Sequence, residues 1–124
     1  MIIAIGCDII ELERIKKAAA RENFCRRIFT QAELAYAKNK SEQGAIASLA
    51  AFFAAKEAAA KALGTGIGKV SLQDIEVGHE ESGKPYITFY NEALSLAQAL
   101  GVVKIHLSLS HSREYAIATA VLEG

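Results

Sequence analysis

Several features that would assign the chain to a special class are scarce or absent in its sequence. It has one proline, two cysteines and no tryptophan, and 14 basic side chains balance 14 acidic ones. The net charge of zero argues against a general nucleic-acid binder, and no apolar run approaches the ~20 residues needed to cross a bilayer. The N-terminal segment lacks a basic leader and a small-residue cleavage site. We therefore interpret Cys7 and Cys25 as free thiols of a cytoplasmic protein that binds neither membrane nor nucleic acid.

The residues that are present suit one folded domain. The length of 124 residues falls within the usual domain range of about 50 to 250. Apolar residues make up 52% of the chain and charged residues 23%, so a core can be buried while the surface stays polar. No low-complexity linker or repeat of fixed period interrupts the sequence. We expect residues 1–124 to form a single domain.

Hydrophobic periodicity and turn residues predict five strands and four helical segments. The expected strands cover residues 2–10, 74–78, 86–90, 104–110 and 114–122. The expected helical segments cover residues 11–20, 22–38, 41–63 and 91–100, with Asn23 and Thr30 as candidate N-caps and Gly64 and Gly101 as stops. Because helices and strands are grouped rather than strictly alternating, the predicted fold class is α+β and not a doubly wound sheet.

The long alanine-rich helix expected over 41–63 carries two charges on or beside its apolar side. At ~100° per residue, Glu57 lies in the middle of an apolar stripe and Lys61 at its edge, one turn later. The stripe consists of Ile46, Leu49, Ala50, Phe53 and Ala60. A core-facing carboxylate is costly unless it is paired with a cation or a metal. A simple Glu57–Lys61 ion pair is the structural alternative, and these two residues alone leave both open.

Asp8 stands inside an apolar strand, where aspartate is rare. By alternation it shares a face with Ile2, Ala4 and Gly6, and the small residues among these leave space beside it. A cap for the helix that follows is the structural alternative. Two carboxylates on adjoining core elements repel, however, unless a cation lies between them. Two carboxylates with substrate phosphates commonly hold Mg²⁺, so Asp8 and Glu57 are candidate metal ligands.

The glycine-rich run Gly64-Thr65-Gly66-Ile67-Gly68-Lys69 is a candidate phosphate contact. Glycines permit close backbone approach, and successive amides can form an anion-binding concavity. The run follows a helix, so the helix dipole disfavours an anion there. It is therefore not a P-loop, and Lys61 and Lys69 would have to supply positive charge. A plain helix stop is the alternative.

The segment Ser108-Leu109-Ser110-His111-Ser112 places hydroxyls and a histidine near the end of an expected strand. His106, Ser108 and Ser110 alternate with apolar residues and line one face. No GxSxG-type nucleophile elbow accompanies these serines, so a hydrolase triad is not indicated. The segment suits contact with a phosphate or a base. Turn residues that cap a hairpin are the alternative.

Basic residues concentrate between residues 14 and 27. If this segment is helical, Arg14, Lys17 and Arg21 fall at i, i+3 and i+7 and share one face. Such a patch can attract an acidic macromolecule and speed encounter. An ordinary solvated helix face is the plainer interpretation.

In order and spacing, these segments resemble the motifs of the holo-(acyl-carrier-protein) synthases, the small bacterial branch of the 4′-phosphopantetheinyl transferase superfamily. The matching segments are Gly6-Cys7-Asp8-Ile9 through Arg14-Ile15, Phe53-Ala54-Ala55-Lys56-Glu57-Ala58 through Lys61-Ala62-Leu63-Gly64-Thr65-Gly66, Gly83-Lys84-Pro85, Ser108–His111 and Tyr115–Ala118. The resemblance covers nearly the whole chain, and its long central motif is highly specific. One departure is Phe52, where the family usually has an arginine that helps hold phosphate or a neighbouring subunit. This departure bears on the affinity for coenzyme A more than on the reaction.

The resemblance implies a long central helix packed on a small antiparallel sheet, and a defined reaction. The enzyme would transfer 4′-phosphopantetheine from coenzyme A to a serine of apo-acyl-carrier protein, releasing adenosine 3′,5′-bisphosphate in support of fatty acid biosynthesis. Asp8 and Glu57 would hold Mg²⁺, with Mn²⁺ an acceptable substitute. Lys61 would be catalytic with Glu57 and could protonate the leaving group. The general base is either Glu57 or a metal-associated water.

The resemblance also implies where the substrates and the subunits meet. Coenzyme A would contact Lys61, Gly64, Thr65, Gly66, Lys84, Pro85, Ser108, Ser110 and His111. The acidic carrier would dock on the face of Arg14, Lys17 and Arg21, and the protein would be a homotrimer with sites at subunit junctions. Two other classes remain open. A metal-dependent pyrophosphate hydrolase would need no carrier, and a non-catalytic nucleotide-binding module would tolerate loss of Glu57.

Overall fold

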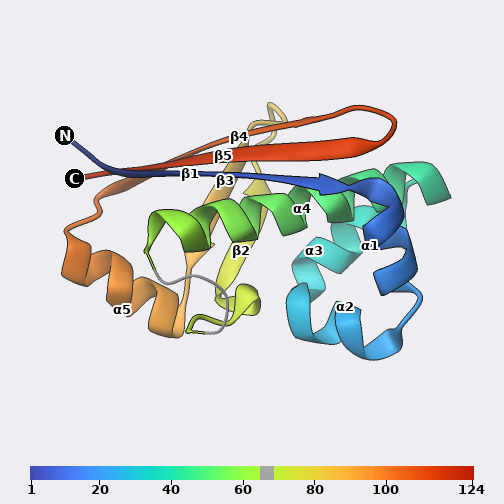
Figure 1. Cartoon of the computed structure of the whole chain (residues 1–124), viewed down its shortest axis with the longest axis horizontal. Coiled ribbons are helices and arrows are strands. Elements are labelled where there is room, and N and C mark those ends of the chain that lie inside the picture. The colour runs from blue at the N-terminus through green and yellow to red at the C-terminus, as the bar shows by residue number, and fades with distance from the viewer. Residues whose placement is uncertain (65–68) are drawn as a thin grey trace.

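The computed structural model describes residues 1–64 and 69–124, and its elements follow the predicted order (Figure 1). They are β1 (Ile2–Glu11), α1 (Leu12–Ala19), α2 (Glu22–Ile28), α3 (Gln31–Lys38), α4 (Glu42–Ala62), the 3₁₀ turn η1 (Leu72–Asp74), β2 (Ile75–His79), β3 (Pro85–Phe89), α5 (Asn91–Leu100), β4 (Lys104–His111) and β5 (Tyr115–Glu123). The helices and strands are grouped along the chain, and the strands of the described residues pair antiparallel. The predicted α+β class is confirmed.

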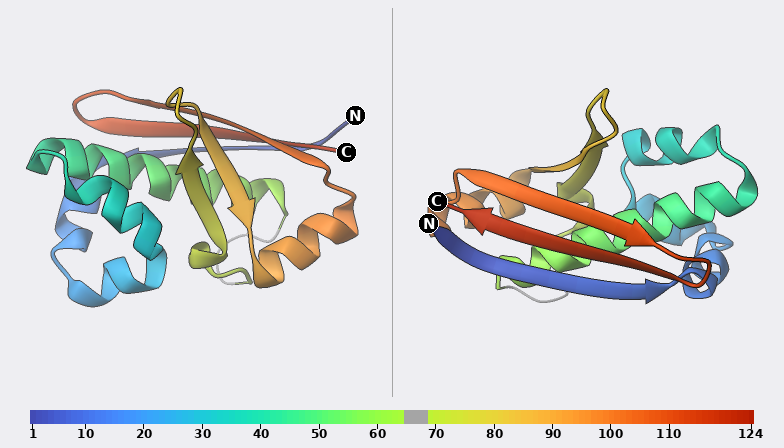
Figure 2. Two further views of the ribbon diagram at one scale, coloured as in Figure 1. Left: turned by 180° about the vertical axis from the view of Figure 1, so that it is seen from behind. Right: turned by 90° about the horizontal axis from the view of Figure 1, so that it is seen from above.

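A three-stranded antiparallel sheet in the order β1-β5-β4 lies along α4, and the hairpin β2-β3 crosses the same helix on another side (Figures 1 and 2). Register places Asp8 opposite Ala118, and Ala118 opposite Leu109. Side chains of a strand alternate between the two faces of a sheet. The side chains of Asp8, Ala118 and Leu109 therefore lie on the face toward α4, and their neighbours along each strand lie on the outer face. In the described part of the chain no helix covers the outer face, which Figure 2 shows from above.

Helix α4 is the centre of the core and is buried nearly all round. A single apolar stripe was the expectation, but buried residues run almost continuously from Ala47 to Ala62. The reason is that the sheet covers one side of the helix while α1, α3 and β2 cover others. Alanine suits such a helix because its small side chain allows close approach on every side. Of the described helices, none is both long and apolar enough to cross a membrane.

Gly6 sets how closely β1 and α4 approach each other. A Cβ atom built at Gly6 would overlap the carbonyl oxygen of Ala58 and crowd the amide nitrogen of Ala62. The strand backbone therefore lies directly against the helix backbone at this point. Asp8, two residues further along the same face, is held close to the last turns of α4.

Several predicted boundaries need correction. The helical segment expected over 22–38 is broken, because Phe29 leaves the helical conformation and Thr30 starts α3 with a capping box to Glu33. Thr30 is confirmed as an N-cap, whereas Asn23 is wrong, since α2 begins after Arg21 without a side-chain cap. His111 closes β4 rather than sitting in the turn. Strands β2 and β3 are each displaced by one residue from the expected ranges.

Candidate active site

A helix and a strand bring three predicted site residues together. Lys61, in the last turn of α4, places Nζ 3.0 Å from Oδ1 of Asp8 on β1 and 3.0 Å from the Cys7 carbonyl oxygen. The Asp8 side chain is 18% exposed and the Lys61 side chain 52%, so the pair lies at a solvent boundary. The helix-cap alternative for Asp8 is wrong, because the residue lies inside β1 and Glu11 occupies the N-cap of α1.

Glu57 completes this cluster from one turn earlier on α4, where it is 7% exposed. Burial raises the pKa of its carboxyl above the ordinary value, and the negative charge of Asp8 raises it further. The charges of Lys61 and Arg14 oppose that rise. Two carboxylates therefore lie close enough to repel each other, with two cationic side chains beside them.

This donor set fits Mg²⁺. Hard carboxylate oxygens are its preferred protein ligands, and Mg²⁺ usually takes one or two of them together with substrate phosphates and waters. A cation shared by Asp8 and Glu57 would offset both the burial of the Glu57 charge and its repulsion by Asp8, the two causes that raise the pKa of Glu57. Within residues 1–64 and 69–124, no group of three or more histidine, cysteine or acidic side chains could hold a metal. The two carboxylates thus suit an ion that depends on substrate oxygens for its remaining ligands.

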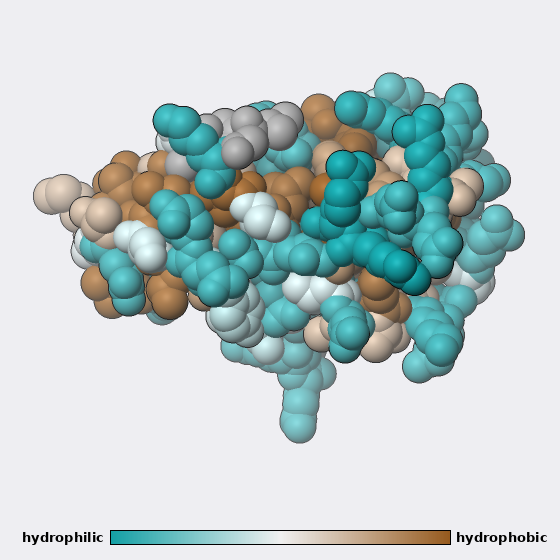
Figure 3. Space-filling model, turned by 90° about the horizontal axis from the view of Figure 1, so that it is seen from below, coloured by the Kyte–Doolittle hydropathy of each residue, from teal (hydrophilic) through white to brown (hydrophobic). Residues whose placement is uncertain are grey.

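Arg14 and Lys17 of α1, together with Arg21 at the N-cap of α2, form the rim of an apolar groove beside this cluster. Arg14, Lys17 and Arg21 all line a cavity of about 360 Å³. The other lining residues are apolar: Ile10, Ile15, Ala18, Phe24 and Phe53. The expected single helix face is wrong for Arg21, because α1 ends at Ala19 and the chain is extended at Arg21, yet the three basic residues still line one groove. The apolar floor was missed, because Phe24 and Phe53 lie 29 positions apart and meet only in the fold. Hydrophilic side chains are concentrated at the end of the molecule that carries α1–α3 (Figure 3).

Ser108 and Ser110 do not join the carboxylate cluster. They alternate on β4 with Leu107 and Leu109, which are partly buried against the core. Asp8 shares the row of Leu109, facing α4, whereas the serines face the outer side of the sheet. Within this chain the sheet itself separates the serines from Asp8.

An aromatic cavity of about 260 Å³ lies beside the end of β4. Ser110 and His111 line it together with Tyr36, Phe52 and His79. The Tyr36 and His79 rings stack 4.2 Å apart, and Phe52 packs against both. Phe52, which replaces the usual arginine, is 1% exposed and so belongs to the core. The sequence singled out Phe52 only as a departure and gave no signal for the stack.

The other predicted coenzyme A contacts are spread over two loops. Lys84 lies in the β2–β3 turn and Pro85 begins β3, so neither residue belongs to the loop that follows α4. Gly64 follows α4 directly and has a φ of +79°, a conformation that favours glycine. Thr65 and Gly66 lie outside the described residues.

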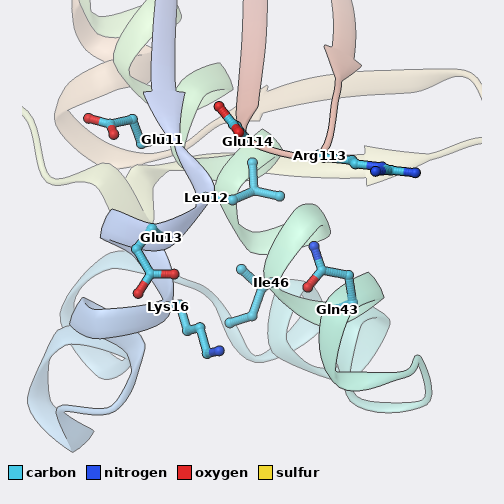
Figure 4. Close-up of a pocket in the computed structure, with 8 residues that line it drawn as sticks. All are labelled: Glu11, Leu12, Glu13, Lys16, Gln43, Ile46, Arg113 and Glu114. Atoms are coloured by element: carbon cyan, nitrogen blue, oxygen red, sulfur yellow. The ribbon is translucent and has the colours of Figure 1, made fainter.

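A further cavity, of about 340 Å³, opens between the start of α1, the first half of α4 and the β4–β5 turn (Figure 4). Leu12 and Ile46 form its apolar part. Its charged lining is mixed, with Glu11, Glu13 and Glu114 against Lys16 and Arg113. The excess of carboxylates makes this cavity a poor site for phosphate, and no predicted site residue lines it.

The whole chain matches proteins of known type. The model of the 4′-phosphopantetheinyl transferase superfamily matches residues 4–120. A holo-[acyl-carrier-protein] synthase of Vibrio cholerae is 49% identical over 126 residues, covering 99% of this chain and 98% of the relative. The crystal structure of a holo-(acyl-carrier-protein) synthase from Bacillus anthracis in complex with CoA (3′,5′-ADP) has a TM-score of 0.84 at 45% identity, covering 100% of this chain and 98% of that one. The synthase of Neisseria meningitidis gives a TM-score of 0.87 at 40% identity, with full coverage of both chains.

Proposed function

The chain belongs to the 4′-phosphopantetheinyl transferase superfamily and is an enzyme of its holo-(acyl-carrier-protein) synthase type. From this premise we propose that it moves the phosphopantetheine arm of coenzyme A onto a serine of an apo-acyl-carrier protein, with Mg²⁺ bound by Asp8 and Glu57. One observation supports the metal-dependent part of this proposal: Asp8, Glu57 and Lys61 lie together at the edge of the sheet.

In the proposed reaction the serine oxygen bonds to the pantetheine-side phosphorus, and the bond from that phosphorus to the departing 3′,5′-ADP breaks. The serine loses a proton while the departing phosphate gains negative charge. The ammonium of Lys61 is half exposed beside Asp8 and is suited to stabilise or protonate that phosphate. Mg²⁺, when bound, would neutralise phosphate charge at the same place. Glu57 or a metal-associated water would accept the serine proton.

The groove beside α1 supports carrier docking. An acidic helix of a carrier would find complementary charge in Arg14, Lys17 and Arg21, and its apolar side chains would meet the floor formed with Phe24 and Phe53. Phe53 and Glu57 are i,i+4 neighbours on α4 and so share one helix face. A carrier seated on this floor would have its serine near the carboxylate cluster.

A homotrimer with shared sites would reconcile the two separated groups of predicted site residues. The outer sheet face exposes Ile5 and Ile9, each by about three fifths of its surface, and also Ile117. Such an apolar face suits a second copy of the chain. A neighbouring copy could then present its Ser110 and His111, with Lys84 and Pro85, to coenzyme A held at Asp8 and Lys61. The trimeric state, the cytoplasmic location and the role in fatty acid biosynthesis rest on the resemblance.

The decisive experiment is mass spectrometry of an apo carrier incubated with the protein, coenzyme A and Mg²⁺. A gain of one phosphopantetheine per carrier is expected, and chelation with EDTA should abolish it. The two remaining alternatives give different results. A pyrophosphate hydrolase would consume coenzyme A without any carrier, and a non-catalytic module would bind coenzyme A and leave the carrier unmodified.

A further inference from the structure

A fully buried ion pair joins α4 to the helices and strands on its far side. Lys56 Nζ lies 2.8 Å from Oε1 of Glu33, and both side chains have 0% exposure. Lys56 belongs to the central motif, directly before Glu57, yet the proposed reaction gives it no task. A buried pair of charges is weak support for stability, because apolar residues of similar volume often serve as well or better. The pair therefore calls for a different explanation.

The partners of this pair show which segments it holds. Lys56 also donates to the carbonyl oxygens of Leu72, at 2.8 Å, and Ile75, at 2.7 Å. These carbonyls belong to η1 and the start of β2, so the ammonium fixes both to α4. Glu33 accepts from the Val77 amide at 2.7 Å through its other oxygen. The pair thus fastens α3, η1 and β2 to one point of α4.

From η1 a second set of contacts leads to the floor of the groove. Gln73 donates from its side chain to the carbonyl oxygens of Phe29, at 3.2 Å, and Arg26, which ties η1 to the end of α2. The Phe29 ring packs edge-on against Phe24, with centroids 6.0 Å apart. Phe24 in turn stacks on Phe53 at 6.1 Å. These last two rings form the floor of the basic-rimmed groove.

We infer that Lys56 is a positioning residue for the carrier-docking groove. Through η1, Gln73 and Phe29 it fixes the end of α2 against α4 and so sets where Phe24 lies relative to Phe53 and Glu57. The inference rests on the proposed function, since it assumes that the carrier occupies this groove. Lys56 touches neither substrate and acts only through these contacts. A groove that is already fixed in shape binds its partner without the cost of ordering it first, so loosening its floor should weaken carrier binding and raise KM for carrier.

Two variants test this route. Lys56→Met combined with Glu33→Gln removes both buried charges together, and the glutamine keeps a carbonyl oxygen to accept from Val77. Gln73→Ala cuts the tie between η1 and α2 at a partly exposed position, where folding is little affected. Gln98→Ala, on the exposed side of α5, is the matched control. KM for apo carrier and KM for coenzyme A are measured for each, with thermal unfolding of the same samples.

Both test variants should raise KM for carrier by about tenfold while KM for coenzyme A stays within about twofold, and Gln98→Ala should change neither. A merely structural role would lower the folded fraction, and with it kcat, without moving either KM. If Gln73→Ala folds normally and keeps the wild-type KM for carrier, the positioning role is wrong. This conclusion holds whether or not the double variant folds. If both constants rise equally, the role is also wrong. Absence of transfer by the wild-type protein would instead overturn the proposed function, and this inference with it.

Discussion

The Nζ atom of Lys61 lies 3.0 Å from Oδ1 of Asp8, although 53 positions separate the two residues along the chain. The contact exists because α4 packs directly on β1 at Gly6, where no side chain keeps the two backbones apart. Glu57 lies one turn before Lys61, and burial together with the negative charge of Asp8 raises the pKa of its carboxyl. One strand and one helix therefore supply the two carboxylates and the lysine at the centre of the proposed phosphoryl transfer.

Asp8 and Glu57 are expected to act as one unit in holding Mg²⁺. Asp8→Ala or Glu57→Ala should each abolish turnover, and the double variant should be little worse than either single one. Initial rates over a range of Mg²⁺ concentrations check this, with circular dichroism to confirm that each variant is folded. Near-normal rates for either single variant at saturating Mg²⁺ would remove the shared metal site.

The two carboxylates of this cluster could be predicted from the sequence, because each stands in a segment whose neighbouring residues are apolar. An aspartate inside the apolar strand over 2–10 and a glutamate on the apolar side of the alanine-rich helix each conflict with their surroundings, and the fold brings the two carboxylates together. The order of elements was predictable for the same reason, since periodicity and glycine stops are local signals.

The remaining features arise from contacts between distant segments. Nothing in the local sequence singles out Lys56, because its burial depends on Glu33 from another helix. The break at Phe29 was missed because no proline or glycine marks it, and the ring is held by packing against Phe24. The separation of Ser110 from Asp8 depends on the sheet order β1-β5-β4, which strand alternation within one segment does not determine.

Glu57 is expected to lower the stability of the metal-free protein at neutral pH. Its pKa is raised in the folded state above the ordinary value of about 4.5, so the folded chain binds this proton more tightly than the unfolded chain. The resulting stabilisation is present at pH values below 4.5 and is lost as pH rises through the raised value. Glu57→Gln should therefore increase the metal-free Tm at pH 7 and flatten its dependence on pH. Calorimetry from pH 4 to 8 measures this, and a lower Tm for the variant at pH 7 would contradict it.

Gly6 is expected to tolerate no side chain. Gly6→Ala would drive a methyl group into the backbone of α4 at Ala58, so the helix or the strand must shift. Overpacking a core typically costs about 1–3 kcal/mol, and contact with backbone places this case at or above the upper end. Urea unfolding measures the loss. Gly44→Ala is the comparison, because the atoms nearest its built Cβ are the side-chain atoms Ser41 Oγ, at 3.1 Å, and Lys40 Cβ, at 3.3 Å, rather than backbone. Its loss of stability should be clearly smaller than that of Gly6→Ala.

The active protein is expected to be an oligomer assembled through the outer face of the sheet. Sedimentation at micromolar concentration should show a species heavier than the 13.3 kDa chain. Ile5→Glu places a charge on this face, where Ile5 is 62% exposed, and should dissociate the assembly and reduce turnover together. Leu94→Glu, at a 41% exposed position on α5, is the matched control and should do neither. A fully active monomer would rule out sites shared between subunits.

Arg14, Lys17 and Arg21 are expected to recruit the carrier rather than coenzyme A. Arg14→Glu or Arg21→Glu should raise KM for carrier by about tenfold, equivalent to about 1.4 kcal/mol, and leave KM for coenzyme A nearly unchanged. The direction follows from charge complementarity at exposed positions, which governs encounter and specificity. Added salt should have the same effect as the substitution, because exposed charges are screened within about 8–10 Å near physiological ionic strength.

Measuring both constants for one variant separates this role from its two competitors. A solvated helix face without a partner predicts no change in either constant. If the three basic residues bind a phosphate of coenzyme A instead, the pattern is reversed and only KM for coenzyme A rises. Arg21→Glu is the cleaner variant, because Arg14 lies close enough to Glu57 to oppose the rise in its pKa. Since both arginines line the same groove, an effect on carrier from Arg14→Glu alone would place the carrier's contact at the carboxylate cluster and not along the groove.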